Sequence, residues 1–262
     1  ISLHQALQAN QEHIFDYTSE AFGSIAEVEK LDFFLSKEDL GLDFKHKEDN
    51  YDDYKQQILL PHSQSNTGPC TAKADVNGDG IADLFIGGAA GQSSVLYVMS
   101  ADGTYVQKAS GLETDKSYED TGACFFDADN DGDNDIYVVS GGAHLPEFHQ
   151  FYTDRLYIND GKGNFKRSSA LPSGTNISGQ GIAASDIDND GDVDLFIGGR
   201  LIPERYPYAP ESFLLINDNG KFTKKILAVD NLVSAAKFAD LNGDGYQDLV
   251  TVGEWSPVNV FI

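Results

Sequence analysis

The chain has 262 residues, 40% of them hydrophobic, and its 42 Asp and Glu against 18 Lys and Arg give a formal net charge of −24. This length is sufficient for a large buried core, and the 26 glycines suit a β-rich globular protein. The large negative net charge argues against nucleic acid as a partner, because phosphate binding needs a basic surface. The sequence contains no run of about eighteen apolar residues, so we expect no membrane-spanning helix.

Residues 1–60 come first in chain order and differ in composition from the rest. Their first half has mixed periodicity, which is compatible with a short helix or with strands that end a preceding domain. The charged stretch at 44–62 is interpreted as a lead-in to the first repeat. Because the chain starts at Ile1 without an initiator Met or a signal peptide, we expect it to be part of a longer protein.

From residue 61 onward, one nine-residue acidic loop recurs four times, and an apolar strand follows each copy. The copies read DVNGDGIAD from Asp75, DADNDGDND from Asp127, DIDNDGDVD from Asp186 and DLNGDGYQD from Asp240. Their starts lie 52, 59 and 54 residues apart, and a fixed period of this size marks an array, a solenoid or a propeller.

Each repeat also carries the pattern of four short strands. A stretch of small or apolar residues precedes the loop, a strand ending in Gly-Gly or Gly-Glu follows it, and a third and a fourth strand flank a glycine-bearing turn. We therefore predict an all-β fold, a β-propeller of four-stranded antiparallel blades. The predicted blades lie at about 66–115, 118–172, 177–230 and 231–262, the last one incomplete.

The acidic loops carry the residue types of a site for a hard cation. Positions 1, 3, 5 and 9 are Asp or Asn, position 6 is always Gly, and position 7 varies, as expected for a ligand that is a backbone carbonyl. Oxygen-only donors favour Ca²⁺ over Zn²⁺ or copper, and Mg²⁺ is less suited because it keeps its waters. We expect about four Ca²⁺ ions. The candidate ligands are Asp75, Asn77, Asp79, Ile81 and Asp83; Asp127, Asp129, Asp131, Asp133 and Asp135; Asp186, Asp188, Asp190, Asp192 and Asp194; and Asp240, Asn242, Asp244, Tyr246 and Asp248.

Two other interpretations of the loops are disfavoured. An EF-hand needs a Glu at position 12 followed by a helix, whereas position 12 here lies in strand-like runs. Asp-Asn-Gly clusters can be simple turns. Four copies in register, with oxygen donors at the same four positions, favour cation binding over turns.

The pattern D-x-[DN]-x-D-G-x-x-D-[LI], followed by an apolar strand and Gly-Gly, resembles the FG-GAP/VCBS repeats of integrin-α-like β-propellers, and the loop from Asn159 to Phe165 is typical of them. The second and third repeats further resemble large repeat proteins of Bacteroidetes cell envelopes, which often carry an ASPIC/UnbV module. The resemblance covers roughly residues 61–262. It implies a Ca²⁺-stabilised propeller, seven-bladed in the intact protein, surface-exposed and non-enzymatic. Asn77 and Asn242 replace Asp at position 3, so the first and last sites should bind more weakly.

Closure of a four-bladed ring within this chain is an alternative to the seven-bladed propeller. In that case the N-terminal region would supply the strand that the last blade lacks.

Two insertions between the second and third strands are the candidate recognition loops. The second repeat inserts residues 143–155 and the third inserts residues 200–212, and their equivalent places predict that they lie side by side on one face. Both are rich in aromatic residues, Pro and Arg, which are frequent at binding hot spots. Packing of these side chains against the blades is the alternative. The candidate partner-binding residues are Phe148, Tyr152, Arg155, Arg200, Arg205, Tyr206 and Tyr208.

Cysteine and histidine give weaker indications. Cys70 and Cys124 should point to the same face of neighbouring first strands, so either a disulfide or two buried thiols is compatible with the pattern. His144 and His149 flank Glu147 at a spacing that matches no metal motif, and they are interpreted as surface-loop histidines. We found no HExxH, GxSxG, P-loop or GxGxxG pattern.

We therefore expect a non-enzymatic module for adhesion, binding or scaffolding, with a protein or glycan partner at a propeller face. The loops indicate an extracytoplasmic location, either secreted or at the cell surface or outer membrane, because extracellular Ca²⁺ modules bind at roughly 10⁻⁴–10⁻³ M. The alternatives are a non-catalytic part of a polysaccharide-processing enzyme and an accessory subunit of an outer-membrane assembly within an envelope complex.

Overall fold

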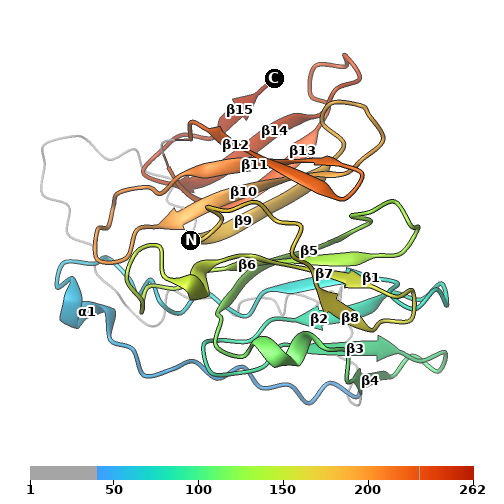
Figure 1. Ribbon diagram of the computed structural model, residues 1–262. Coiled ribbons are helices and arrows are strands. Elements are labelled where there is room, and N and C mark those ends of the chain that lie inside the picture. Colours follow the sequence, from blue (N-terminus) through green and yellow to red (C-terminus); the bar gives the residue numbers. More distant parts are fainter. Residues whose placement is uncertain (1–39, 230) are drawn as a thin grey trace, which may run out of the picture. The chain divides into compact units, whose positions relative to one another are not determined.

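In the described part of the chain, fifteen strands fall into four antiparallel sheets that follow one another along the sequence (Figure 1). The computed structural model describes residues 40–229 and 231–262, so the expectations for residues 1–39 lie outside the described residues. The first sheet consists of β1 (Thr71–Ala74), β2 (Asp83–Ile86), β3 (Val95–Met99) and β4 (Tyr105–Lys108). The second consists of β5 (Asp120–Phe126), β6 (Asp135–Ser140), β7 (Arg155–Asn159) and β8 (Phe165–Arg167). The third consists of β9 (Ser178–Ser185), β10 (Asp194–Leu201), β11 (Ser212–Asp218) and β12 (Lys221–Leu227), and the fourth of β13 (Leu232–Ala239), β14 (Asp248–Glu254) and β15 (Asn259–Phe261).

Each sheet is a simple meander in which consecutive strands are hydrogen-bonded neighbours. The acidic loop joins the first and second strands of every sheet, as predicted, and the pairing of Phe126 with Asp135 closes the hairpin around it in the second sheet. One short helical turn, α1 (Asp53–Gln56), precedes β1, and two others, η2 (Leu112–Asp115) and η3 (Gln150–Tyr152), lie between strands. The prediction of an all-β propeller architecture built from four-stranded blades is confirmed.

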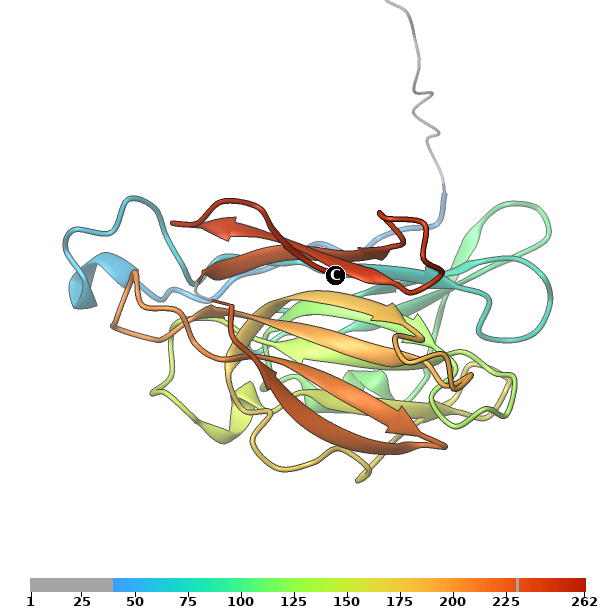
Figure 2. The ribbon, with the colours of Figure 1, turned by 90° about the horizontal axis from the view of Figure 1, so that it is seen from above.

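The sheets pack face to face, so that β5 lies against β1 and β9, and β9 lies against β13 (Figures 1 and 2). Alternating apolar side chains fill the space between neighbouring sheets, and three separate core clusters result. Gly122 marks the close approach of β5 and β9, because a Cβ there would lie 2.4 Å from the backbone oxygen of Gln180. Four blades therefore share three blade–blade cores.

The segment after residue 40 packs against the first sheet. The backbone oxygen of Leu40 accepts a hydrogen bond from Tyr105 N (2.7 Å), and the Tyr97 hydroxyl donates to Asp43 (2.6 Å). Further along, both Ser63 and Ser65 donate to Asp53, which is 4% exposed. The contacts of Leu40 and Asp43 attach this segment to the first sheet, and those of Asp53 hold the segment itself together.

The fourth sheet has three strands, and several apolar side chains around β14 and β15 are exposed, among them Trp255 and Val260. None of the helices in the part of the chain that the structure describes combines the length and the hydropathy needed to cross a bilayer.

Candidate functional site

The four acidic loops (residues 75–83, 127–135, 186–194 and 240–248, here loops 1 to 4) share one hydrogen-bonded scaffold. In every loop the Gly at position 6 donates its N–H to the Asp at position 1, at 2.7 to 3.0 Å. The N–H of position 7 donates to the Asp at position 5, at 2.8 to 3.0 Å. The short Asp side chains therefore hold the loop in a tight turn with their oxygens on its inner side.

Two positions in each loop have a left-handed backbone. The Gly at position 6 has φ between 82° and 97° in all four loops. Position 4 is also left-handed and is occupied by Gly78, Asn130, Asn189 and Gly243. Gly and Asn are the residues that adopt this conformation most readily. The restriction of position 4 to Gly or Asn was visible in the sequence. The reason for this restriction, a positive φ at position 4, is apparent only from the backbone angles.

The Asp at position 9 is the buried anchor of each loop. Asp83, Asp135 and Asp194 are 0% exposed and Asp248 is 2% exposed. One carboxylate oxygen accepts the N–H of position 2 at 2.9 to 3.1 Å. In the first three sheets the other oxygen accepts a backbone N–H at the end of the third strand, at 2.7 to 2.9 Å. The residue predicted to close the cation shell thus also connects the loop to its sheet.

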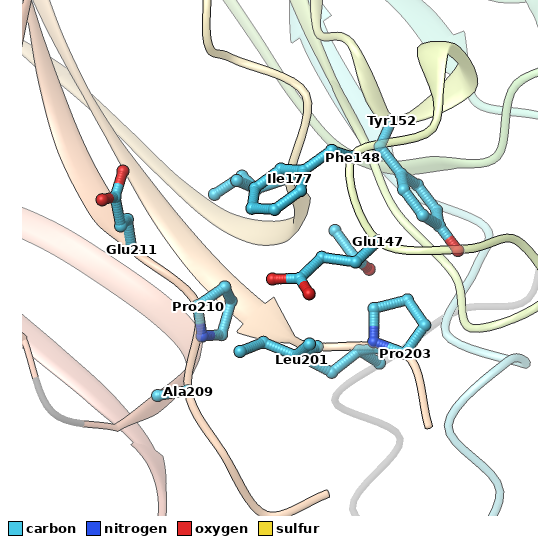
Figure 3. A pocket seen from close by; sticks show the side chains of 11 residues that line it. Glu147, Phe148, Tyr152, Ile177, Leu201, Pro203, Ala209, Pro210 and Glu211 are labelled. Atoms are coloured by element: carbon cyan, nitrogen blue, oxygen red, sulfur yellow. The ribbon is translucent and has the colours of Figure 1, made fainter. Parts of the chain in front are cut away.

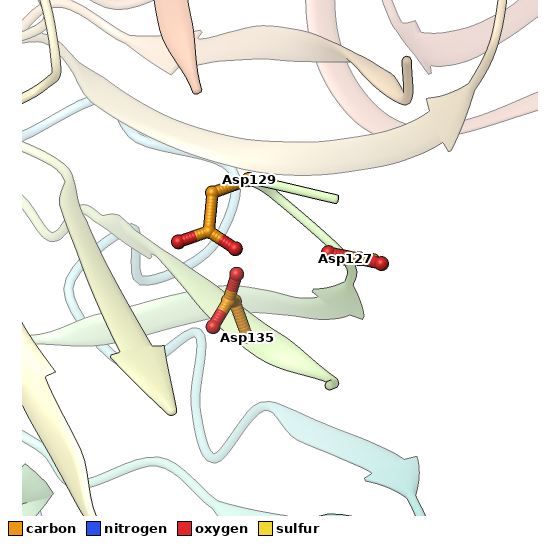
Figure 4. Close-up of side chains that lie close together, drawn as sticks. All are labelled: Asp127, Asp129 and Asp135. Atoms are coloured by element: carbon orange, nitrogen blue, oxygen red, sulfur yellow. The ribbon is translucent and has the colours of Figure 1, made fainter. Parts of the chain in front are cut away.

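Loops 2 and 3 bring three carboxylates together. Asp127, Asp129 and Asp135 each offer an oxygen within 4.8 Å of the others, and Figure 4 shows Asp129 and Asp135 facing one another beside Asp127. The equivalent residues of loop 3 are Asp186, Asp188 and Asp194, which form the same cluster. Burial raises the pKa of Asp135 to about 6, and the charges of Asp129 and Asp131 add to the effect of burial against two backbone hydrogen bonds. A cation in the cluster would offset this repulsion.

Loops 1 and 4 have Asn at position 3 and form no three-carboxylate cluster among the described residues. Their scaffold hydrogen bonds are nevertheless the same as those of loops 2 and 3. At position 7 the side chains differ: Tyr246 is exposed, whereas Asp192 is buried and accepts hydrogen bonds from Asn130 and from Asn219 N. The backbone carbonyl is therefore the one oxygen of position 7 that all four loops have in common.

Two buried asparagines connect loops 2 and 3 to the preceding blades, and the sequence analysis missed them. Asn159 donates its side-chain amide to the backbone oxygen of Val76 in loop 1 (2.9 Å), and Asn217 donates to that of Ala128 in loop 2 (3.0 Å). Their backbone N–H groups are the third-strand donors to position 9. The repeated Ile-Asn-Asp at the end of the third strand was the signal that could have revealed them.

The two insertions meet at the opposite end of the strands, as predicted. A cavity of about 270 Å³ lies between them, and Figure 3 shows Glu147 and Phe148 from one insertion facing Leu201 and Pro210 from the other. Arg205 forms an ion pair with Glu147 across the two insertions, with Nη1 and Oε2 3.6 Å apart. The full lining is Glu147, Phe148, Tyr152, Ile177, Ser178, Leu201, Ile202, Pro203, Ala209, Pro210 and Glu211.

Three of the seven candidate partner-binding side chains are buried, and this corrects their assignment. Tyr152 is 1% exposed and shares hydrogen bonds with the backbone of Leu145. Arg155 and Arg200 are 1% and 7% exposed. For these three residues the packing alternative holds, because a folded chain does not present them to a partner.

The buried arginines instead join blades. Arg155 pairs with Asp120 of β5, whose other oxygen accepts from Gly88 N (2.9 Å) in the first sheet. Arg200 pairs with Glu254 and donates to the backbone oxygen of Leu232 (3.3 Å) in the fourth sheet.

The other four candidates remain accessible to different degrees. Phe148 is 62% exposed, Tyr208 is 71% exposed and the Arg205 side chain is 65% exposed. Tyr206 is half-buried, donates its hydroxyl to Glu254 (2.9 Å) and accepts from Trp255. The accessible part of the predicted surface is therefore Phe148, Arg205 and Tyr208.

The two cysteines are not bonded to each other. Burial raises the pKa of the Cys124 thiol to about 11, and burial also raises that of Cys70. Of the two alternatives left open by the sequence, the structure has the pair of free thiols.

A family model described as "FG-GAP-like repeat" matches residues 75–138 and 147–197, which contain loops 1 to 3. These two segments of the chain therefore consist of FG-GAP-like repeats. No curated protein matches it.

The solved structures that are similar to parts of the chain include the following two. One is the Dos1 propeller, with 8% identity and a TM-score of 0.45 over 72% of this chain and 43% of that one. The other is the Vibrio cholerae (V. cholerae) biofilm matrix protein Bap1, with 22% identity and a TM-score of 0.33 over 74% of this chain and 36% of that one. The chain thus spans less than half the length of either. At these scores the fold assignment rests on the four sheets and on the repeats themselves.

Proposed function

We propose that this chain is a Ca²⁺-binding propeller module that holds a protein or glycan partner outside the cytoplasm, without catalysing a reaction. The observation that carries the proposal is the convergence of three carboxylates in loop 2 and of the three equivalent carboxylates in loop 3. Holding three carboxylates so close together raises the electrostatic free energy of the folded state, unless a cation is bound among them.

The donor set and its dimensions fit Ca²⁺. The ion takes six to eight oxygens at about 2.3–2.6 Å, so two ligands on opposite sides of it lie about 5 Å apart. The clustered oxygens lie within 4.8 Å of one another. Position 5 and the carbonyl of position 7 would complete the shell. We propose that all four loops bind one ion each, with loops 2 and 3 the tighter sites.

The proposed role of the ion is structural. The Asp at position 9 already connects the loop to the third strand, and Asn159 and Asn217 extend this connection to the preceding blade. A cation shared by positions 1, 3 and 9 would therefore stiffen both the hairpin and the blade junction. The side chain at position 5 is exposed in all four loops and accepts the N–H of position 7 of the same loop.

The partner would bind at the face formed by the two insertions. The cavity there is mostly apolar, with Phe148 on its rim and the carboxylates of Glu147 and Glu211 in its wall. Phe148 has φ of 61°, an unfavourable angle for a residue with a Cβ, and Asn176 donates to its backbone oxygen (2.7 Å). Strained residues of this kind are frequent at binding sites. Cell-surface, outer-membrane-associated and secreted locations all provide the Ca²⁺ concentration that such sites require.

Thermal unfolding with millimolar Ca²⁺, with Mg²⁺ and with a chelator tests the proposal. We expect a Ca²⁺-specific rise in melting temperature, because a ligand that binds only the folded state stabilises it by mass action. The double substitution Asp129→Asn and Asp188→Asn should remove much of this rise. Equal melting temperatures in all three conditions would show that the loops are simple turns and would remove the basis for the location.

A further inference from the structure

The side chains that line the cavity between the two insertions offer hydrogen-bond acceptors but no free donor. Apart from Glu147, Ser178 and Glu211, every lining side chain is aliphatic or aromatic. The hydroxyls of Ser178 and Tyr152 already donate to backbone oxygens outside the lining, at 2.7 and 2.9 Å. A ligand that fills this cavity must therefore be largely apolar and must bring its own donors.

Glu147 places a carboxylate inside the apolar space. Figure 3 shows its side chain reaching from the second-blade insertion into the space between Ile177 and Leu201. Its Oε2 lies 3.6 Å from Arg205 Nη1, which is longer than a hydrogen bond. The Arg205 side chain is 65% exposed and does not line the cavity, so this ion pair lies at the rim and contributes little. The carboxylate is thus available to a cation inside the cavity.

The second carboxylate of the lining is less suited to bind a ligand. The Glu211 side chain is 55% exposed, and its Oε2 lies 3.4 Å from Lys224 Nζ. The same ammonium group donates to the backbone oxygen of Gly174 (2.6 Å), which holds it beside Glu211. Because Glu211 faces solvent and has a cation of its own, Glu147 is the group that would fix the position of a charged ligand.

The walls of the cavity are held in place by the fold itself. On one side, the backbone oxygen of Phe148 accepts a hydrogen bond from Asn176 (2.7 Å). On the other side, Pro203 and Pro210 restrict the backbone, and Gly199 allows the insertion to approach β10, because a Cβ on it would lie 2.6 Å from Pro210 Cγ. A preformed cavity reduces the ordering that binding requires.

The size of the cavity limits the ligand. Its volume of about 270 Å³ lies just below the usual range of small-molecule sites, about 300–1,000 Å³. Small-molecule sites of this kind are mostly apolar, and a few polar groups in them fix the orientation of the ligand. The cavity therefore suits a molecule with roughly one ring and one charged group.

We propose that this cavity binds a small organic amine in its protonated form, with an apolar body the size of one aromatic ring. The ammonium group would donate to Glu147, and the aromatic ring of Phe148 on the rim would also favour a cation. The net charge of −24 favours the approach of a cation over that of an anion. A sugar or a carboxylic acid would need donors that the lining side chains do not supply. This inference rests on the part of the proposed function that places binding at the insertions, and it names the ligand of the cavity itself.

The test is a calorimetric titration of the 262-residue chain with phenethylamine in saturating Ca²⁺. We expect one binding site per chain. Phenethyl alcohol, in which a hydroxyl replaces the ammonium group, and hydrocinnamate, which carries a carboxylate, should each bind at least about tenfold more weakly.

Substitutions locate the site. Glu147→Gln should weaken phenethylamine binding by at least about tenfold. Glu204→Gln, on an exposed residue of the third-blade insertion outside the lining, is the matched control and should bind as the parent does. Arg205→Gln removes the cation that competes for Glu147, so it should leave binding unchanged or tighten it by up to about fivefold.

A Gly-Gly-Lys-Gly-Gly peptide with both ends blocked distinguishes a free amine from a lysine side chain of a protein partner. We expect it to bind more weakly than phenethylamine, and tighter binding of the peptide would overturn the proposal in favour of a protein lysine. The proposal is also overturned if phenethylamine does not bind, if it binds no more tightly than phenethyl alcohol, or if Glu147→Gln with a parent-like melting temperature binds it as the parent does. The Ca²⁺-specific rise in melting temperature is measured without the amine, so failure of this proposal and failure of the proposed function are separate results.

Discussion

The side-chain amide of Asn217, at the end of β11, donates a hydrogen bond to the backbone oxygen of Ala128 in loop 2 of the preceding blade, 3.0 Å away. The same residue donates its backbone N–H to Asp194 of its own loop at 2.8 Å. One asparagine therefore connects the candidate cation site of one blade to the loop of another. Asn159 does the same between the second blade and the first.

Replacing Asn217 by Ala should lower the free energy of unfolding by about 1–3 kcal/mol, because the backbone oxygen of Ala128 loses a buried donor. Urea unfolding in saturating Ca²⁺ measures this change. Asn164→Ala, on an exposed turn of the second blade, is the control and should change stability by less than about 0.5 kcal/mol. Equal losses in the two variants would show that the interblade hydrogen bond contributes nothing specific.

The charge at position 3 should set the affinity of each loop for Ca²⁺. Asn77→Asp gives loop 1 an Asp at position 3, as in loops 2 and 3, and we expect it to tighten binding there by roughly tenfold, or about 1.4 kcal/mol. Asp129→Asn should weaken loop 2 by a similar factor. Calorimetric titration should resolve two classes of site in the parent chain and a shift of one site between classes in each variant. A single class that neither substitution alters would contradict this expectation.

The Arg155–Asp120 pair is 1% and 2% exposed, so breaking it leaves a buried charge. Arg155→Met should destabilise the protein by about 3–5 kcal/mol. The double variant with Asp120→Asn should recover part of this loss, because the unpaired carboxylate is then absent. Lys55→Met breaks an exposed pair with Asp52 and serves as the control, with an expected effect of about 0–1 kcal/mol. Chemical unfolding of the parent, of Arg155→Met, of Asp120→Asn and of the double variant measures the coupling, and strictly additive losses would mean that the pair is energetically independent.

Asp154 should make stability depend on pH. Its carboxylate is 2% exposed, and burial raises its pKa to about 7 although Ser140 N and the Tyr137 hydroxyl donate to it. An unfolded Asp titrates near about 3.9, so between about pH 4 and pH 7 the folded state holds the extra proton. The contribution of the protonated Asp154 to the free energy of unfolding is complete below about pH 4 and is lost as the pH rises through about 7. The free energy of unfolding falls in this range by at most about 1.4 kcal/mol per pH unit.

Asp154→Asn should therefore flatten the fall in the free energy of unfolding over this pH range. Urea unfolding at several pH values and a fixed Ca²⁺ concentration measures the slope. Glu204→Gln, on the exposed part of the third-blade insertion, should keep the slope of the parent. A parent-like slope in Asp154→Asn would mean that Asp154 does not titrate in this range.

Substitution of the exposed aromatic residues in the two insertions tests whether these side chains bind a partner or only pack against the blades. Phe148→Ala and Tyr208→Ala should weaken a protein or glycan that binds the parent chain by at least about tenfold, with little change in melting temperature, because both side chains are mostly exposed. Tyr152→Ala lines the same cavity but is buried, so it should lower the melting temperature markedly. Biolayer interferometry against partners selected from glycan and protein panels, together with thermal unfolding, distinguishes the two effects. Unchanged binding in both exposed variants would assign these loops to packing alone.

The sequence by itself determined the repeats, the strand order and the loop chemistry. Each of these depends on residues close together in the chain: a Gly at position 6 must be left-handed, the Asp side chains at positions 1 and 5 accept N–H groups of their own loop, and strand alternation is local. It also predicted that the two insertions lie side by side, because equivalent places in successive blades are neighbours.

Only the tertiary structure decided which of those loop side chains face solvent and which buried groups meet between blades. Arg155 and Arg205 look alike in the sequence, yet one is buried against Asp120 and the other is exposed. Asn217 and Ala128 are 89 residues apart, and Glu119 and His144 belong to different segments with no shared motif. These contacts depend on the angle and distance at which the sheets pack, and no local pattern in the chain encodes those quantities.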